Sequence, residues 1–193
     1  MTPQGFNMYI HDELAEDSVL GIPYVKRKPG AHSYVNLREH PELISELPEL
    51  KDCPPLLAIV TALNAMSSPF ETFGCDKGPE EWSNPQYPGC IARYGSYLDV
   101  AFVTKQMCSK EGYQELILRF REYAAEKHVK GFHSMMHVFF SLRTTVSRLT
   151  GNWWTLSVHN CGVGRSEEEA KNWWGQCVHH TQEFLLTKQL PLV

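Results

Sequence analysis

The sequence has no long apolar run and no excess of basic charge. Its 193 residues include 18 lysine and arginine residues against 22 aspartate and glutamate residues, for a formal net charge of −4. This balance gives no electrostatic reason to bind nucleic acid or an anionic membrane. No apolar run approaches the roughly 18 residues that a membrane-spanning helix needs. We therefore expect neither nucleic acid nor a membrane among the partners of this protein.

The sequence also lacks the marks of secreted and zinc-knuckle proteins. Residues 1–5 are polar and do not have the charged-then-apolar layout of a secretory signal. The six cysteines are widely spaced, and no two of them form a Cys-x-x-Cys pair. We therefore expect free thiols in a reducing compartment, the cytoplasm, rather than a disulfide framework.

The residues that are present suffice for a folded core. Hydrophobic residues make up 42% of the chain and aromatic residues 11%, which argues against wholesale disorder. A chain of this length fits one domain. We expect a single domain over residues 1–193, with an irregular N-terminal arm at about residues 1–40.

Hydrophobic periodicity becomes regular from Ile91 onward. Alternation predicts strands at 97–104 and 153–159, and apolar spacing of three and four predicts helices at 109–128, 132–149 and 166–189. Ser166 and Glu169 form a capping box at the start of the last helix. The order β-α-α-β-α predicts an α+β fold, a small sheet with helices packed on it, compatible with half of a ferredoxin-like sandwich. An α/β fold with parallel strands is the alternative.

Two further segments precede this regular half. Cys53 with Pro54 and Pro55 is typical of a helix start, and an uncharged, mostly apolar helix is expected over residues 55–66. Residues 69–90 combine prolines, glycines and aromatics without a period, which predicts a long aromatic loop. This loop could pack over an open edge of the core or serve as a lid or ligand-binding segment.

Histidine and cysteine give the candidate chemistry. His133 and His137 are four residues apart on an expected helix, a spacing that suits zinc, iron or haem, although both fall on its polar face. Cys53 at a helix N-terminus could act as a nucleophile with His159 as its base. Cys161, which follows His159 at the end of a strand, is a third candidate catalytic residue. The simpler interpretation of Cys53 is a helix cap.

Aromatic residues give the candidate binding groups. Trp82 and Tyr87 lie in the expected loop, Arg93 follows it, and Trp173 lies at the edge of the apolar stripe of the last helix. The glycines of residues 160–166 do not match a dinucleotide or P-loop motif, and Glu167 to Glu169 would repel a phosphate there.

Two functions remain open from the sequence. The first is a small enzyme or small-molecule-binding domain, with an aromatic pocket between the 69–90 loop and the helices of the second half. The alternative is a non-enzymatic module, of the inhibitor or immunity type, that binds a protein partner through exposed aromatic side chains.

Overall fold

The structure is a computed structural model that describes residues 24, 35–85, 87–128, 135–147 and 151–187. The elements follow the order η1 (Pro41–Glu46), η2 (Pro48–Leu50), α1 (Pro54–Leu63), β1 (Phe70–Glu81), β2 (Ala92–Phe102), η3 (Lys105–Met107), α2 (Lys110–His128), β3 (Met136–Ser147), β4 (Gly151–Gly164) and α3 (Glu167–Thr187). No helix of these described residues is long and apolar enough to cross a membrane.

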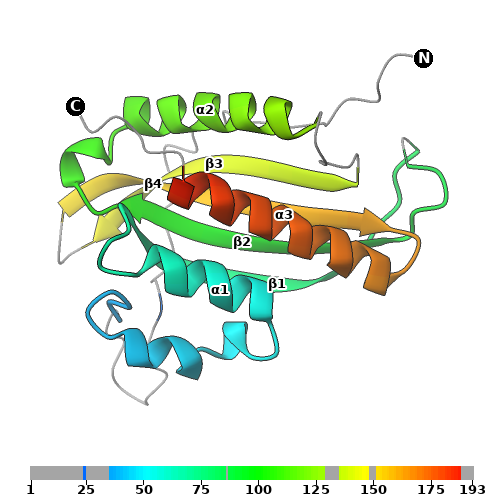
Figure 1. Cartoon of the computed structure of the whole chain (residues 1–193), viewed down its shortest axis with the longest axis horizontal. Helices are drawn as coiled ribbons and strands as arrows, with labels where there is room; N and C mark the ends of the chain where they lie inside the picture. Colours follow the sequence, from blue (N-terminus) through cyan, green and yellow to red (C-terminus); the bar gives the residue numbers. More distant parts are fainter. Residues whose placement is uncertain (1–23, 25–34, 86, 129–134, 148–150, 188–193) are drawn as a thin grey trace.

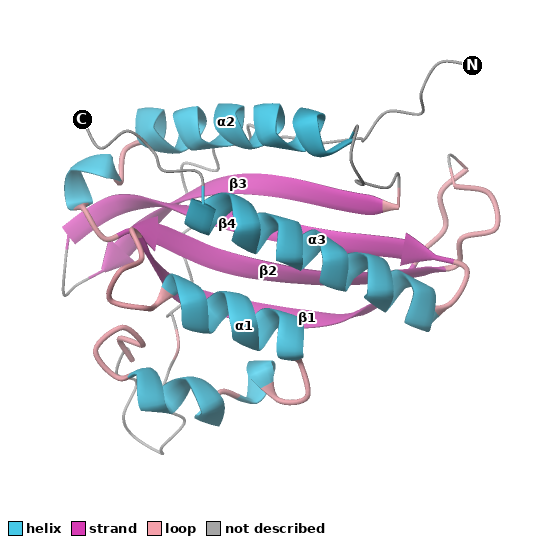
Figure 2. Ribbon diagram, viewed as in Figure 1, coloured by secondary structure: helices cyan, strands magenta, loops and turns pink. Residues whose placement is uncertain are grey.

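The four strands form one antiparallel sheet in the order β1-β2-β4-β3. Helices α1, α2 and α3 pack against the same side of this sheet (Figures 1 and 2). Helix α3 lies over β4 and β2, and α1 packs beside α3. The protein therefore has an α+β fold, as the sequence predicts, and the three strand pairs of the described sheet are antiparallel rather than parallel.

The topology of the second half is β-α-β-β-α. Strands β2 and β3 both run antiparallel to β4, which lies between them, so they are parallel to each other. Helix α2 connects them, which makes the split β-α-β arrangement found in ferredoxin-like sandwiches. The fourth strand is β1, which pairs with the outer side of β2 from upstream in the chain.

The predicted order β-α-α-β-α is wrong at one element. Residues 136–147 form strand β3 rather than part of a helix over 132–149. Met136, Val138 and Phe140 belong to the hydrophobic core cluster, whereas His137 and Phe139, which alternate with them, do not. Alternation of this kind requires a strand, and the β-branched and aromatic residues of the segment favour one.

The predicted long loop at 69–90 is also wrong over most of its length. Residues 70–81 form strand β1, which contains Gly74, Gly78 and Pro79. β1 pairs only with β2 in the described sheet, and an edge strand tolerates a proline that a central strand would exclude. The connection from β1 to β2, residues 82–91, remains a loop.

Three predicted helices are confirmed together with their starts. Cys53 is the N-cap of α1. Ser109 caps α2, because its Oγ accepts a hydrogen bond from the Gly112 amide at 3.0 Å. In α3 the Ser166 Oγ accepts from the Glu169 amide at 3.2 Å, while the Glu169 carboxylate accepts from the Arg165 amide at 2.8 Å.

The core lies between the sheet and the helices. Trp174 of α3 is buried there, with its ring 4.8 Å from that of Tyr94 and its Nε1 donating to Ser96 Oγ at 2.9 Å. Gly162 and Gly164 of β4 permit this contact: a side chain at Gly164 would lie 2.6 Å from the Ala170 amide nitrogen. These glycines therefore serve the close approach of α3 rather than a loop.

Candidate functional site

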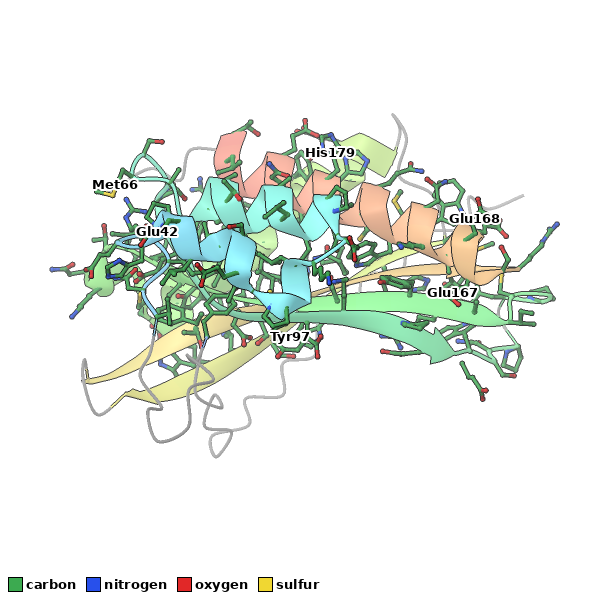
Figure 3. The ribbon with its side chains drawn as sticks, turned by 90° about the horizontal axis from the view of Figure 1, so that it is seen from below. Glu42, Met66, Tyr97, Glu167, Glu168 and His179 are labelled. Carbon is green, nitrogen blue, oxygen red and sulfur yellow. The ribbon has the colours of Figure 1, made fainter. Side chains whose placement is uncertain are left out.

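The side of the sheet opposite the helices, here called the open face, carries the candidate site. Tyr94 and Ser96 of β2 contact α3, so Arg93, Gly95 and Tyr97 face the other way because successive strand residues alternate. Figure 3 shows the helices gathered on one side of the strands, with Tyr97 labelled beside the strands.

Strand register aligns the open-face residues in rows that run across the sheet. The central row is Gly78, Gly95, Cys161 and His137, from β1 to β3. The row on one side of it is Asp76, Tyr97, His159 and Phe139, and the row on the other side begins with Glu80 and Arg93. The central row starts with two residues that have no side chain.

A cavity of about 290 Å³ lies in this gap, and we call it the trench. Gly78 and Gly95 form its floor. Glu80 and Arg93 line one side, Asp76, Tyr97 and His159 line the other side, and Cys161 lies at the β4 end. A Cβ added to Gly78 would meet no atom within 4 Å, whereas one at Gly95 would lie 3.5 Å from Glu80 Oε1 and 3.6 Å from Cys161 Sγ. The trench is therefore open above Gly78.

Arg93 is the basic group that faces the trench. Its guanidinium pairs with Glu80 at 3.3 Å and donates to Cys161 Sγ at 3.0 Å. Lys77 also borders the cavity, but its ammonium group donates to the carbonyl of Lys51 at 3.2 Å and to that of Glu49. The Arg93 side chain is 25% exposed, so the guanidinium is held at the edge of solvent.

The rings of Trp82 and Phe139 lie beside Arg93, and we call these two rings together with Tyr87 and His137 the aromatic cluster. The guanidinium carbon lies 5.3 Å from the Trp82 ring centroid and 5.7 Å from that of Phe139. The Tyr87 and Trp82 rings meet that of His137 edge-on at 5.2 and 6.4 Å. The loop from β1 to β2 therefore reaches across the open face to β3.

Burial sets the protonation of two groups at this end of the trench. His137 is 4% exposed, and its burial together with the Arg93 charge lowers its pKa to about 4, so the ring is neutral at pH 7. Burial raises the pKa of Cys161, an effect that Arg93 only partly opposes. Cys161 is therefore a neutral thiol at pH 7 and a poor nucleophile.

The structure brings together most of the residues that the sequence singled out. Trp82, Tyr87, Arg93, His137, His159 and Cys161 all lie on or over the open face. The trench differs in position from the expected pocket, because it lies across the sheet from the helices and not between them and the loop.

Three predicted site residues do not join this group. Cys53 caps α1 on the helix side, so the sheet separates it from His159 and the two cannot form a catalytic pair. Trp173 lies on α3 and packs against the core on that same side. His133 lies outside the described residues.

The hypothesis of a metal site at His133 and His137 assumed that both residues lie on one helix, and His137 does not lie on a helix. His137 is in strand β3, where a residue four positions away is not one helical turn away. The described part of the chain contains no group of three or more histidine, cysteine, aspartate or glutamate residues arranged to hold a metal ion. All six cysteines fall within the described residues as free, buried thiols.

Sequence reasoning did not select Asp76, Gly78, Glu80, Gly95 and Tyr97 as site residues. The signal that could have found them is the alternation of Asp76, Gly78 and Glu80, which becomes visible only if residues 70–81 are assigned to a strand. The glycines of that segment favoured a loop instead.

Comparison with protein-family models, with curated proteins and with solved structures finds no match for this chain.

Proposed function

We propose that this protein binds a small polar molecule in the trench on the open face of the sheet. The observation that carries the proposal is the 290 Å³ cavity above Gly78 and Gly95, with ionic and aromatic side chains around it. Ligand sites are concave and combine ring surfaces with a few converging polar groups. The volume lies at the lower end of the range of about 300 to 1,000 Å³ that small-molecule pockets occupy, so a small ligand suits it.

The chemistry of the trench favours binding over nucleophilic catalysis. Cys161 is the thiol that borders it, and its raised pKa keeps the sulfur protonated at pH 7. Tyr97 and His159, whose ring centroids lie 6.1 Å apart with planes inclined by 43°, offer two ring surfaces beside the opening. Such rings suit a planar ligand.

The alternative, a module that binds a protein through exposed aromatics, has less support. The large exposed hydrophobic side chains among the described residues are Leu57, Met66, Ile91, Val103, Leu118 and Leu186, none of them aromatic. Trp82, Tyr87 and Trp173 are each half-buried.

Ligand-dependent thermal unfolding tests the proposal. Wild type is screened against small amines, carboxylates, amides and sugars, with Gly78→Val as the matched variant. A ligand at ten times its dissociation constant should stabilise wild type by about 1.4 kcal/mol, which raises Tm by roughly 3 to 6 °C for a domain of this size. The valine side chain enters open space, so the variant should fold normally and lose the shift.

Two outcomes would contradict the proposal. One is that no compound raises the Tm of wild type. The other is that the same compounds raise the Tm of wild type and of Gly78→Val equally, because their site would then lie elsewhere on the molecule.

A further inference from the structure

Arg93 holds a fixed orientation beside the trench, but its donors are only partly satisfied. The rings of Trp82 and Phe139 flank its guanidinium at 5.3 and 5.7 Å. Its Nε is buried and has no hydrogen-bond partner among the described residues, and one terminal nitrogen donates to a sulfur, Cys161 Sγ. Sulfur is a weak acceptor, so among the described residues Glu80 supplies the only strong acceptor for this guanidinium.

Two neighbouring groups are unsatisfied in the same way. Trp82 Nε1 and His137 Nε2 are buried and also lack a hydrogen-bond partner within the described residues. Both rings belong to the aromatic cluster around Arg93. Buried polar atoms are nearly always hydrogen-bonded in folded proteins, so three unsatisfied nitrogens in one cluster mark donors that are incompletely paired among the described residues. His137 is 96% buried, since it is only 4% exposed, and it can donate from Nε2 in one neutral tautomer.

The charge and shape of this group identify the acceptor. Arg93 lines the trench, so its guanidinium can reach an anion there, and the planar fork of arginine matches a carboxylate in two parallel hydrogen bonds. Glu80 already places a carboxylate on Arg93, and the Glu80 side chain is 54% exposed, so a competing carboxylate can replace it. Asp76 adds a second negative charge across the trench, which disfavours a doubly charged phosphate.

We propose that the trench ligand is a small aromatic monocarboxylate whose carboxylate binds Arg93 in place of Glu80. Its ring then lies over the Gly78–Gly95 floor, beside Tyr97 and His159. This assignment rests on the proposed function, because it names the ligand class of that same cavity. Glu80 is accordingly an internal competitor for the ligand.

The test uses benzoate, with benzamide and benzylamine as neutral and cationic probes of the same shape. The Arg93 Nε–H resonance, identified by its loss in Arg93→Lys, reports binding during titration of the full chain. We expect wild type to bind benzoate about tenfold more tightly than benzamide, since hydrogen bonds between charged groups are about twice as strong as neutral ones. Glu80→Gln should tighten benzoate binding several-fold, and Arg93→Gln should abolish the preference for benzoate.

The outcomes separate the two proposals. Two results would overturn the carboxylate assignment and leave the trench as a ligand site. One is binding that Gly78→Val abolishes but that substitutions of Arg93 and Glu80 do not change. The other is tighter binding of benzylamine than of benzoate. Weaker benzoate binding in Glu80→Gln would also overturn the assignment. Because the Glu80 side chain is exposed, this variant should fold normally, and its result is informative even if Arg93→Gln does not fold. Failure of wild type to bind any of the three probes would overturn the assignment as well. The compound screen with Gly78→Val then shows whether the trench binds any other small molecule.

Discussion

His137 is a titratable group whose protonation opposes folding. Its ring contacts those of Trp82, Tyr87 and Phe139. Two other strands carry the charged groups on this side: Arg93 is on β2, and its partner Glu80 is on β1. Cys161 lies opposite His137 on β4. Burial and the Arg93 charge place the pKa of His137 at about 4, against an ordinary value of 6.5. Only the unfolded chain takes up this proton between those two pH values.

Stability should therefore fall as pH falls through this window. The unfolded state binds more protons than the folded state between pH 6.5 and pH 4, so the free energy of unfolding decreases from pH 7 towards pH 4, by up to about 3 kcal/mol from this residue. In His137→Phe this part of the pH dependence should be absent. Urea unfolding of both proteins at a series of pH values measures the difference, and identical pH slopes would show that His137 titrates normally.

Gly162 is a residue where a single methyl group decides the packing of α3. A Cβ at this position would overlap the Ala170 carbonyl oxygen and the Trp174 amide nitrogen, which are backbone atoms and cannot rotate away. We expect Gly162→Ala to lower the free energy of unfolding by more than about 3 kcal/mol, an effect of overpacking. Chemical unfolding measures this loss.

Gly78→Ala is the matched control for that substitution. The added methyl group meets no atom within 4 Å, so the free energy of unfolding should change by less than about 1 kcal/mol. If the two alanine variants were equally stable, the close approach of α3 to β4 would be wrong.

At the scale of elements, Asn64 joins the end of α1 to the edge strand β1. Its Nδ2 donates to the Val60 carbonyl at 2.8 Å and to Thr72 Oγ1 at 2.6 Å, while its Oδ1 accepts from the Thr72 amide at 3.1 Å. The residue is 3% exposed, so water cannot replace these bonds when the side chain is removed.

Truncation of Asn64 should therefore cost more than a surface change. We expect Asn64→Ala to lower the free energy of unfolding by about 2 to 4 kcal/mol, since three hydrogen bonds are lost and the Thr72 amide is left unsatisfied. Asn172→Ala, on the exposed side of α3, should change it by less than about 0.5 kcal/mol. A similar loss in both variants would contradict the role of Asn64 in joining α1 to β1.

Helix α3 and strand β3 differ in how well their local sequence predicts their secondary structure. Helix α3 carries a capping box and one continuous apolar face, so local rules predicted its start and its buried residues Trp174, Cys177 and Val178. Strand β3 was mistaken for a helix because its apolar residues fit spacings of both two and three-to-four. The choice between them depends on pairing with β4, which lies outside the segment itself.

Strand β1 was missed for a related reason. Its glycines and proline weaken the local signal for a strand, and its hydrogen bonds come from β2. A strand at the edge of a sheet is stabilised by the partner strand more than by its own propensity.

For the whole molecule, the sheet separates two environments. The side that faces the helices is lined with apolar residues such as Leu98, Val138 and Val158, all fully buried, whereas the open face carries Arg93, His137 and His159. Strand alternation assigns each residue to one of these sides, so a slip of register by one position would exchange them. The trench exists because the central row of the open face begins with Gly78 and Gly95.

The sequence by itself determined the α+β class, the three helices α1, α2 and α3, and six residues of the candidate site. These follow from composition, periodicity and caps, which act over a few neighbouring residues. Only the tertiary structure decided that β1 and β3 are strands, that Cys53 and His159 lie on opposite sides of the sheet, and that Glu80 meets Arg93 above two glycines. Strand pairing joins residues distant in the chain, and no local pattern specifies which strands will meet.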